Sequence, residues 1–295
     1  MTLPLDEDAV TAVFLPPYCD GGFERDFFDY LNDLGGLRRS VILAFAPKAA
    51  GTYLRSAAIV AADGVLVRTC HAQGGRDASF YMPIFVRYFA GGHPAKTLVT
   101  HVHMQALPAN QRFIEAFDLK PVIMIRAIPD MLASYADMLA ADPLMPDNWL
   151  NIAVPQNYAA LTREQKSDFL IDMMGPWYAS YFATWLDFAA SDPRVLVLDY
   201  GEFLADPVSV LMRLLDHSGL PRSRQVCQGA LDGIWEDRGS YRYNRGVSGR
   251  GRERFTPEQI ARLERQLDYY PNLAGMKDRL IPPPSASSPR PSAAA

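Results

Sequence analysis

Residues 40–57 read SVILAFAPKAAGTYLRSA, and this stretch predicts a strand, a tight loop and a helix in direct succession. Val41 to Phe45 form a short apolar run of the kind that a buried parallel strand shows, and Pro47 ends it. From Tyr53 onward, apolar residues recur at helical spacing. The small residues in between predict a tight turn from the strand into the helix.

The loop between this strand and this helix has the composition of an anion-binding site. Gly51 lets the backbone approach a bound group closely, the first N–H groups of the helix point toward that group, and Lys48 adds a positive charge. It is not a Walker loop, because the pattern G-x-x-x-x-G-K-[ST] is absent and the lysine precedes the glycine. An ordinary strand-to-helix turn that contains a lysine is the alternative interpretation.

The composition excludes several classes of protein. The chain has 295 residues, of which 49% are apolar, and this suits one large domain or two small ones with a substantial core. A net charge of −4 gives no basic surface for nucleic acid. Cys19, Cys70 and Cys227 stand far apart and indicate neither a disulfide framework nor a zinc site. Because the sequence shows no secretory leader and no apolar run of membrane-spanning length, we expect a cytoplasmic protein.

Strands and helices alternate along the rest of the chain. Further short strands are predicted at 64–68, 97–101, 121–125 and 194–199. Helices are predicted at 107–117, 129–140, 163–174, 176–190 and 208–217, and a capping box at Thr256 opens another. This alternation predicts an α/β fold with a mostly parallel central sheet and helices on both faces.

Three polar stretches follow predicted strands directly, at residues 48–52, 101–103 and 126–134. In a parallel sheet, ligands bind beyond the carboxyl ends of the strands. We therefore expect these stretches to form one shared site.

The last of these stretches predicts a second anion site. Arg126 follows a strand, and Ser134 lies four residues beyond Asp130 on the next helix. An arginine fork together with a hydroxyl group can bind a phosphate that is separate from the first one. The alternative is an arginine at a helix cap or one that forms an ion pair with Asp130.

The two anion motifs together resemble those of the sulfotransferases. The loop is similar to the P-K-x-x-G-T/S pattern that holds the 5′-phosphosulfate of PAPS (3′-phosphoadenosine 5′-phosphosulfate), and residues 126–134 match the R-x-x-x-D-x-x-x-S pattern of its 3′-phosphate site. A third stretch, residues 244–256, resembles the family's R-K-G-x-x-G-x-W-x-x-x-F-T segment. There, Asn244 replaces the first arginine and Gly251 replaces the tryptophan.

The resemblance implies a P-loop-like three-layer sandwich. It places a sulfotransferase domain at residues 38–280, after a lead-in at 1–37 and before a disordered tail at 281–295. The residues that it implies for nucleotide binding are Lys48, Ala49, Ala50, Gly51, Thr52, Tyr53, Arg126, Ser134, Tyr200, Tyr243, Arg245 and Gly246. The three tyrosines would contact the adenine, and core packing is the alternative role for each.

Two histidines are candidates for the catalytic base. His101 ends a predicted strand and has Pro108 seven residues on, as in the stretch that carries the family's catalytic histidine. His103 stands where that stretch has its first proline, and at strand spacing it faces the same way as His101. His101 is the choice that the resemblance favours, and Lys48 is implied to act with it in catalysis.

The implied reaction moves the sulfuryl group of PAPS, as co-substrate, to a hydroxyl or amine of a small-molecule, lipid or carbohydrate acceptor, with no metal. Two other functions stay open: a catalytically silent nucleotide-binding protein of the same fold, and a P-loop-like phosphotransferase. We expect neither a nucleic-acid partner nor a membrane span, and a homodimer is left open.

Overall fold

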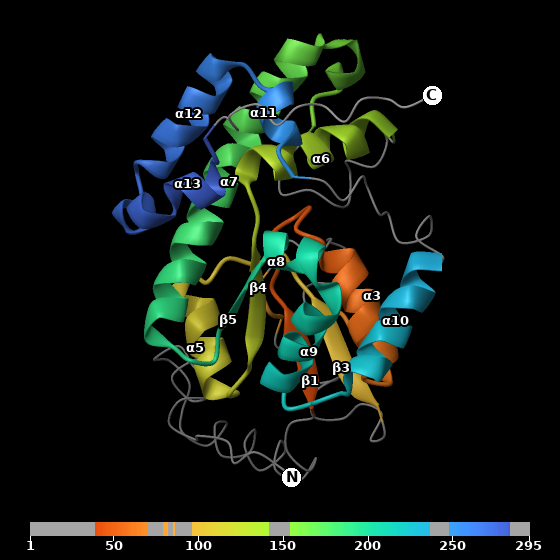
Figure 1. Cartoon of the computed structure of the whole chain (residues 1–295). Helices are drawn as coiled ribbons and strands as arrows, with labels where there is room; N and C mark the ends of the chain where they lie inside the picture. Colours follow the sequence, from red (N-terminus) through yellow and green to blue (C-terminus); the bar gives the residue numbers. More distant parts are fainter. Residues whose placement is uncertain are drawn as a thin grey trace.

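Five parallel strands form the centre of the molecule (Figure 1). The computed structural model describes residues 39–69, 79–81, 85, 96–141, 154–236 and 248–283. Within them the strands are β1 (Ser40–Leu43), β2 (Gly64–Leu66), β3 (Thr97–His101), β4 (Pro121–Ile125) and β5 (Leu196–Asp199). Their order is β2-β3-β1-β4-β5, and every neighbouring pair is parallel. The predicted parallel α/β sheet is confirmed.

Helices cover the sheet on both sides (Figure 1). On one face, α3 (Gly51–Ala61) packs on β1, β2 and β3, and α9 (Pro207–His217) and α10 (Arg224–Glu236) pack against it. The other face carries α5 (Pro108–Ala116) and the long α7 (Arg163–Ser191). The predicted three-layer arrangement follows from these two helical layers.

The remaining helices gather mainly beyond the carboxyl ends of the strands, at the top of Figure 1. They are α6 (Ile128–Ala141), the 3₁₀ turn Tyr158–Ala160, α8 (Tyr200–Ala205), α11 (Arg250–Arg254), α12 (Pro257–Leu267), the 3₁₀ turn Pro271–Met276 and α13 (Lys277–Leu280). None of the helices in the described ranges is both long and apolar enough to cross a membrane.

The chain reverses its direction across the sheet between β1 and β4. From β1 the chain runs through α3 to β2 and β3, on one side of β1. It then returns through α5 to β4, on the other side of β1. Loops that leave two such neighbouring strands diverge and open a crevice at their carboxyl ends. The loop after β1 and Arg126 after β4 both lie there.

The structure corrects the prediction of two separate helices at 163–174 and 176–190. One helix of 29 residues, α7, runs through both, with Pro176 inside it. A proline in a helix removes one backbone hydrogen bond and crowds the preceding turn. Buried residues on either side of it, among them Met174, Tyr178 and Trp185, keep the helix against the sheet and offset that cost.

Helices α8, α10 and α11 lie in stretches for which the sequence analysis predicts no helix. In α10 the buried residues Cys227, Ala230, Leu231 and Ile234 recur at helical spacing, which is the signal that could have revealed it. The capping box at Thr256 is confirmed, because its hydroxyl accepts from the N–H of Gln259 and the Gln259 side chain accepts from the N–H of Thr256. The predicted lead-in and nearly all of the predicted tail lie outside the described residues.

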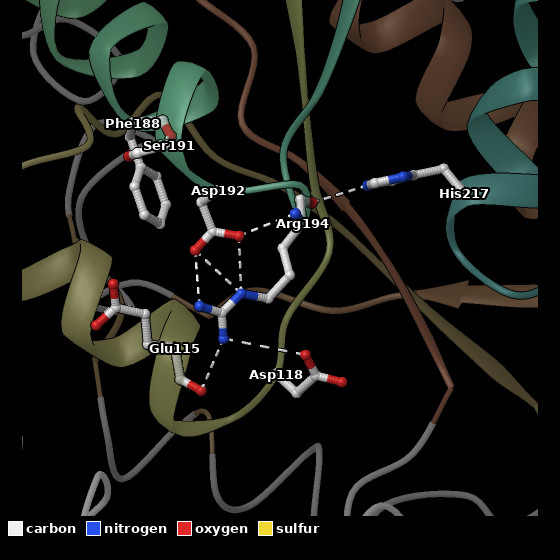
Figure 2. Close-up of polar contacts among 7 residues, drawn as sticks. All are labelled: Glu115, Asp118, Phe188, Ser191, Asp192, Arg194 and His217. Atoms are coloured by element: carbon white, nitrogen blue, oxygen red, sulfur yellow. Dashed lines mark hydrogen bonds and ion pairs between the residues drawn. The ribbon is translucent and has the colours of Figure 1, made fainter.

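An ion pair at the amino edge of the sheet holds several elements together (Figure 2). Asp192, just after α7, accepts from Nε of Arg194 at 2.9 Å, from its Nη2 at 2.7 Å and from its backbone N–H at 2.9 Å. Arg194 also donates to the carbonyl of Glu115 at 3.1 Å, and its own carbonyl lies 2.9 Å from Nε2 of His217. The pair therefore joins the ends of α5, α7 and α9 to the start of β5.

Asp192→Asn should lower the free energy of unfolding by about 2 kcal/mol, because it removes a charged, bidentate acceptor from a buried position. For a chain of this size that corresponds to a Tm decrease of roughly 4–8 °C. Asp118→Asn is the matched control, since its carboxylate is half exposed and stands 4.0 Å from Arg194. Equal Tm values for the two variants would contradict this assignment.

The same cluster makes the fold sensitive to acid. The bonds from Arg194 lower the pKa of Asp192, and burial lowers the pKa of His217. In both cases the unfolded chain takes up the proton more readily than the folded chain, so the stability from each group is lost as the pH falls. We expect Tm to decline first below about pH 6.5, from His217, and again below about pH 4, from Asp192. His217→Gln should remove the first decline.

Candidate functional site

The loop between β1 and α3 has an unusual backbone. Lys48 has a φ of 68° and Ala50 has a φ of 63°, so two residues with side chains adopt the left-handed region. Ala50 is also the N-cap of α3, and no side chain caps that helix end. Such conformations cost on the order of 1–3 kcal/mol each and are concentrated at ligand-binding sites. Curved backbone of this kind before a helix is a typical cradle for an anion.

Two side chains from other elements hold carbonyl groups of this loop. The hydroxyl of Tyr178 on α7, which is fully buried, donates to the carbonyl of Pro47 at 3.0 Å. Nη1 of Arg126, the residue after β4, donates to the carbonyl of Lys48 at 2.6 Å. The loop is thereby connected to both α7 and the second predicted anion motif.

Arg126 is itself tightly enclosed. Only 9% of its surface is exposed, and its guanidinium carbon lies 3.9 Å from the centre of the Tyr200 ring. A stacked, always-charged guanidinium is held in one orientation while several donors stay available. Its Nε is buried and meets no hydrogen-bond acceptor among the residues that the structure describes.

The carboxylate of Asp130 serves the backbone of α11 instead of Arg126. Its two oxygens accept from the N–H groups of Gly249 and Gly251, each at 2.8 Å. No ion pair between Asp130 and Arg126 occurs in the described structure, so the ion-pair alternative for this motif is not realised. Ser134 is buried on the same helix, one turn beyond Asp130.

Helix α11 lies very close to α6, and this explains one departure from the family pattern. A Cβ atom on Gly251 would stand 2.2 Å from the carbonyl carbon of Pro129, so a tryptophan does not fit there. Two turns further along α6, Asp137 forms an ion pair with Arg250 and lies 3.7 Å from Nη1 of Arg254. Burial lowers the pKa of Arg254. Asp130 and Asp137 together hold α11 over the start of α6.

A cavity of about 510 Å³ opens beside Arg126. It lies at the carboxyl ends of β4 and β5, under α11 and the end of the described chain. Arg252 and Arg279 line it along with Arg126, and sequence reasoning identified neither of them. Nε of Arg252 donates to the carbonyl of Pro282 at 2.7 Å, and Nη2 of Arg279 donates to Asp199 at 2.5 Å. The fold brings these arginines to one place from separate parts of the chain: Arg252 stands at an unspecified position of the stretch 244–256, and Arg279 follows no motif.

His101 and His103 lie side by side at the end of β3. Their ring centroids are 4.7 Å apart, and the rings meet edge to face. His101 is buried against the start of α3, because a Cβ atom on Gly51 would stand 2.2 Å from its Nε2. His103 is half-buried, and its Nδ1 donates to the carbonyl of Phe45 at 2.6 Å. Both predicted candidates therefore lie beside the loop.

Of the other predicted residues, only some lie at the loop after β1. Nζ of Lys48 lies 3.7 Å from Sδ of Met138, one turn beyond Ser134 on α6. Tyr53 is buried, with its hydroxyl 3.4 Å from the carbonyl of Leu231 and its ring against Phe203. Ala49 precedes the left-handed Ala50, and Thr52 is the second residue of α3. The predicted residues Tyr243, Arg245 and Gly246 lie outside the described residues.

The described residues contain no cluster of three or more histidine, cysteine, aspartate or glutamate side chains that could hold a metal ion.

The mouse sulfotransferase SULT7A1 complexed with PAP superposes with a TM-score of 0.59 and 14% identity, over 84% of this chain and 91% of that one. Retinol dehydratase in complex with androsterone and the inactive cofactor PAP gives a TM-score of 0.50 and 13% identity, over 83% and 85%. A search of curated protein sequences found no match.

These superpositions define the class of fold, and the predicted P-loop-like α/β sandwich is confirmed. The family model for the sulfotransferase domain matches residues 92–277. The chain belongs to the sulfotransferase domain family, and the predicted class of enzyme is confirmed. The matched residues include His101, Arg126 and Ser134 but not the loop after β1, which the structure places beside them.

Gly51→Ala should destabilise the protein by about 1–3 kcal/mol, because the new methyl group overlaps the buried His101 ring. Thermal unfolding of Gly51→Ala in the wild-type and the His101→Ala backgrounds measures this overlap. The cost of the alanine should largely disappear where the imidazole is absent. Ala50→Gly, at the neighbouring left-handed position, should leave stability unchanged or raise it by up to about 1 kcal/mol. An equal cost of Gly51→Ala in both backgrounds would argue against the contact.

Proposed function

We propose that this protein transfers the sulfuryl group of PAPS to a hydroxyl or amine of an acceptor. The observation that carries the proposal is the meeting of two anion motifs at one crevice. Arg126, from the motif that resembles a 3′-phosphate site, contacts the carbonyl of Lys48 in the loop that resembles a 5′-phosphosulfate site. An elongated nucleotide with anionic groups at both ends fits such a pair of motifs.

The loop supplies the features that a phosphosulfate requires. Its left-handed residues and the uncapped start of α3 offer backbone N–H groups and a favourable helix dipole. Lys48 would stabilise the negative charge that grows on the 5′-phosphate as it leaves. The adjoining cavity, with Arg126, Arg252 and Arg279, is where we place the 3′-phosphate. Ser134 and Arg245 would bind the same group, as the resemblance implies.

The chemical step needs one proton acceptor. The acceptor oxygen or nitrogen bonds to sulfur as the bond from sulfur to the 5′-phosphate oxygen breaks, and its proton passes to His101. The products are the sulfated acceptor and PAP, the nucleotide without the sulfuryl group. A transition state of this loose, in-line kind is stabilised mainly by positioning and by opposing charge. The mouse sulfotransferase and the retinol dehydratase whose folds are similar are both complexed with PAP.

The donor assignment predicts a strong preference between two nucleotides. PAP should bind at least about a hundredfold more tightly than adenosine 5′-monophosphate (AMP), which lacks the 3′-phosphate. Two hydrogen bonds to a charged group contribute roughly 3 kcal/mol, which corresponds to this ratio. Calorimetry with PAP, AMP and ATP plus Mg²⁺ measures it.

Similar affinities for PAP and AMP, or a preference for ATP with Mg²⁺, would refute the donor assignment and favour a phosphotransferase. Binding of PAP without sulfate transfer from labelled PAPS to any acceptor in a metabolite mixture would indicate a catalytically silent nucleotide-binding protein.

The choice of base predicts unequal effects at the two neighbouring histidines. His101→Ala should lower kcat by roughly 10²–10⁴, with PAP affinity nearly unchanged, because it removes only the proton acceptor. His103→Ala should have a much smaller effect on kcat and serves as the matched control. Steady-state kinetics with saturating PAPS distinguish the two. The opposite ranking would assign the base to His103.

A further inference from the structure

Two consecutive carbonyl groups of the loop after β1 are held by side chains that come from other elements. Tyr178 donates to the carbonyl of Pro47 at 3.0 Å, and Arg126 donates to the carbonyl of Lys48 at 2.6 Å. Both donors are almost fully enclosed, with exposed fractions of 0% and 9%. Buried hydrogen bonds of this kind fix a geometry, because the carbonyl has no water to replace its partner.

Holding these carbonyls sets the direction of the loop's N–H groups. In a trans peptide the C=O and the following N–H point in opposite directions. The orientation of the Pro47 carbonyl therefore determines where the N–H of Lys48 points. The Lys48 carbonyl does the same for the N–H of Ala49, which closes the turn by donating to the carbonyl of Ala46 at 3.2 Å. Lys48 itself has a φ of 68°, a conformation that persists only where the surroundings enforce it. The hydrogen bonds from Tyr178 and Arg126 enforce it, together with the backbone bond from Ala49 to Ala46.

Arg126 differs from Tyr178 because it also belongs to the other motif. Its guanidinium lines the cavity where we place the 3′-phosphate, and it stacks on Tyr200 at the end of β5. One donor, Nη1, is committed to the loop. A planar guanidinium has five N–H donors in fixed directions, so a contact with an anion in the cavity also fixes the donor that holds the loop.

We propose that Arg126 couples the two phosphate sites: it binds the 3′-phosphate and, with the same guanidinium, positions the loop for the 5′-phosphosulfate, while Tyr178 positions that loop alone. Tyr178 is thus a positioning residue for the reaction. The proposal rests on the proposed function, because it takes both anions to be parts of one nucleotide. Coupling of this kind is reciprocal, so an occupied 3′ site raises affinity at the loop, and an occupied loop raises affinity at the 3′ site.

Three variants and two nucleotides separate these roles. AMP places a phosphate on the loop only, whereas PAP occupies both sites. Tyr178→Phe removes one hydroxyl and keeps the buried ring. Arg126→Met keeps an unbranched apolar chain against Tyr200, and Ser134→Ala removes a hydroxyl proposed to serve only the 3′-phosphate. Arg213→Ala, on the outer side of α9 where its side chain pairs with Glu202, is the surface control.

Each variant has its own expected pattern of affinities, measured by calorimetry. Tyr178→Phe should weaken the binding of AMP and the binding of PAP by the same factor of about ten, the effect of one buried hydrogen bond. Arg126→Met should lower the affinity for AMP about tenfold and the affinity for PAP about a hundredfold or more. Ser134→Ala should lower the affinity for PAP about tenfold and leave the affinity for AMP as in the wild type. Hydrogen exchange of residues 46–54 should become faster in Tyr178→Phe and Arg126→Met only.

The proposal is overturned if AMP binds Arg126→Met as tightly as it binds the wild type, because Arg126 would then serve the 3′-phosphate alone. Unchanged AMP affinity and hydrogen exchange in Tyr178→Phe would overturn the part assigned to Tyr178, even if Arg126→Met does not fold. A wild-type protein that fails to prefer PAP over AMP would refute the proposed function. That result is distinct from the others, since it is read before any variant is made.

Discussion

The hydrogen bond from Arg126 to the carbonyl of Lys48 joins the two strands at which the chain reverses its direction across the sheet. It links the loop after β1 to the end of β4, and stacking on Tyr200 extends the link to β5. The strained loop is therefore not an isolated turn. Its shape depends on a charged side chain that also lines the cavity, and this connects the geometry of the two proposed anion positions.

Two layers of support surround this contact. On one side, α7 holds the loop through the hydrogen bond from Tyr178 to Pro47, which is possible because the helix continues through Pro176. On the other side, Asp130 and Asp137 on α6 hold α11 against the cavity. The close approach of α11 requires Gly251, because any side chain at that position would overlap Pro129. Rigid elements on both sides position the site more accurately than loops alone could.

Much of the fold could be predicted because its signals are local. The strands 97–101 and 121–125 are bounded as the apolar runs indicate, and Thr256 caps α12 as its spacing with Gln259 indicates. The continuity of helix α7 could not be predicted, because whether a proline ends a helix depends on which side chains the turns on either side of it bury. Arg252 and Arg279 were not identified, because no pattern of residues distinguishes a cavity arginine from a solvated one.

By itself, the sequence determined the alternating strands and helices and the turn from the first strand into its helix, since each depends on neighbours within a few residues. It also singled out residues 48–52, Arg126 and Ser134, whose proposed role is to bind anions. Only the tertiary structure decided that Arg126 donates to Lys48 and not to Asp130, that Tyr178 holds Pro47, and that His101 lies against Gly51. These contacts join residues 50 to more than 100 positions apart. Their partners are selected by the order of the strands and the packing of helices on the sheet, which no local pattern encodes.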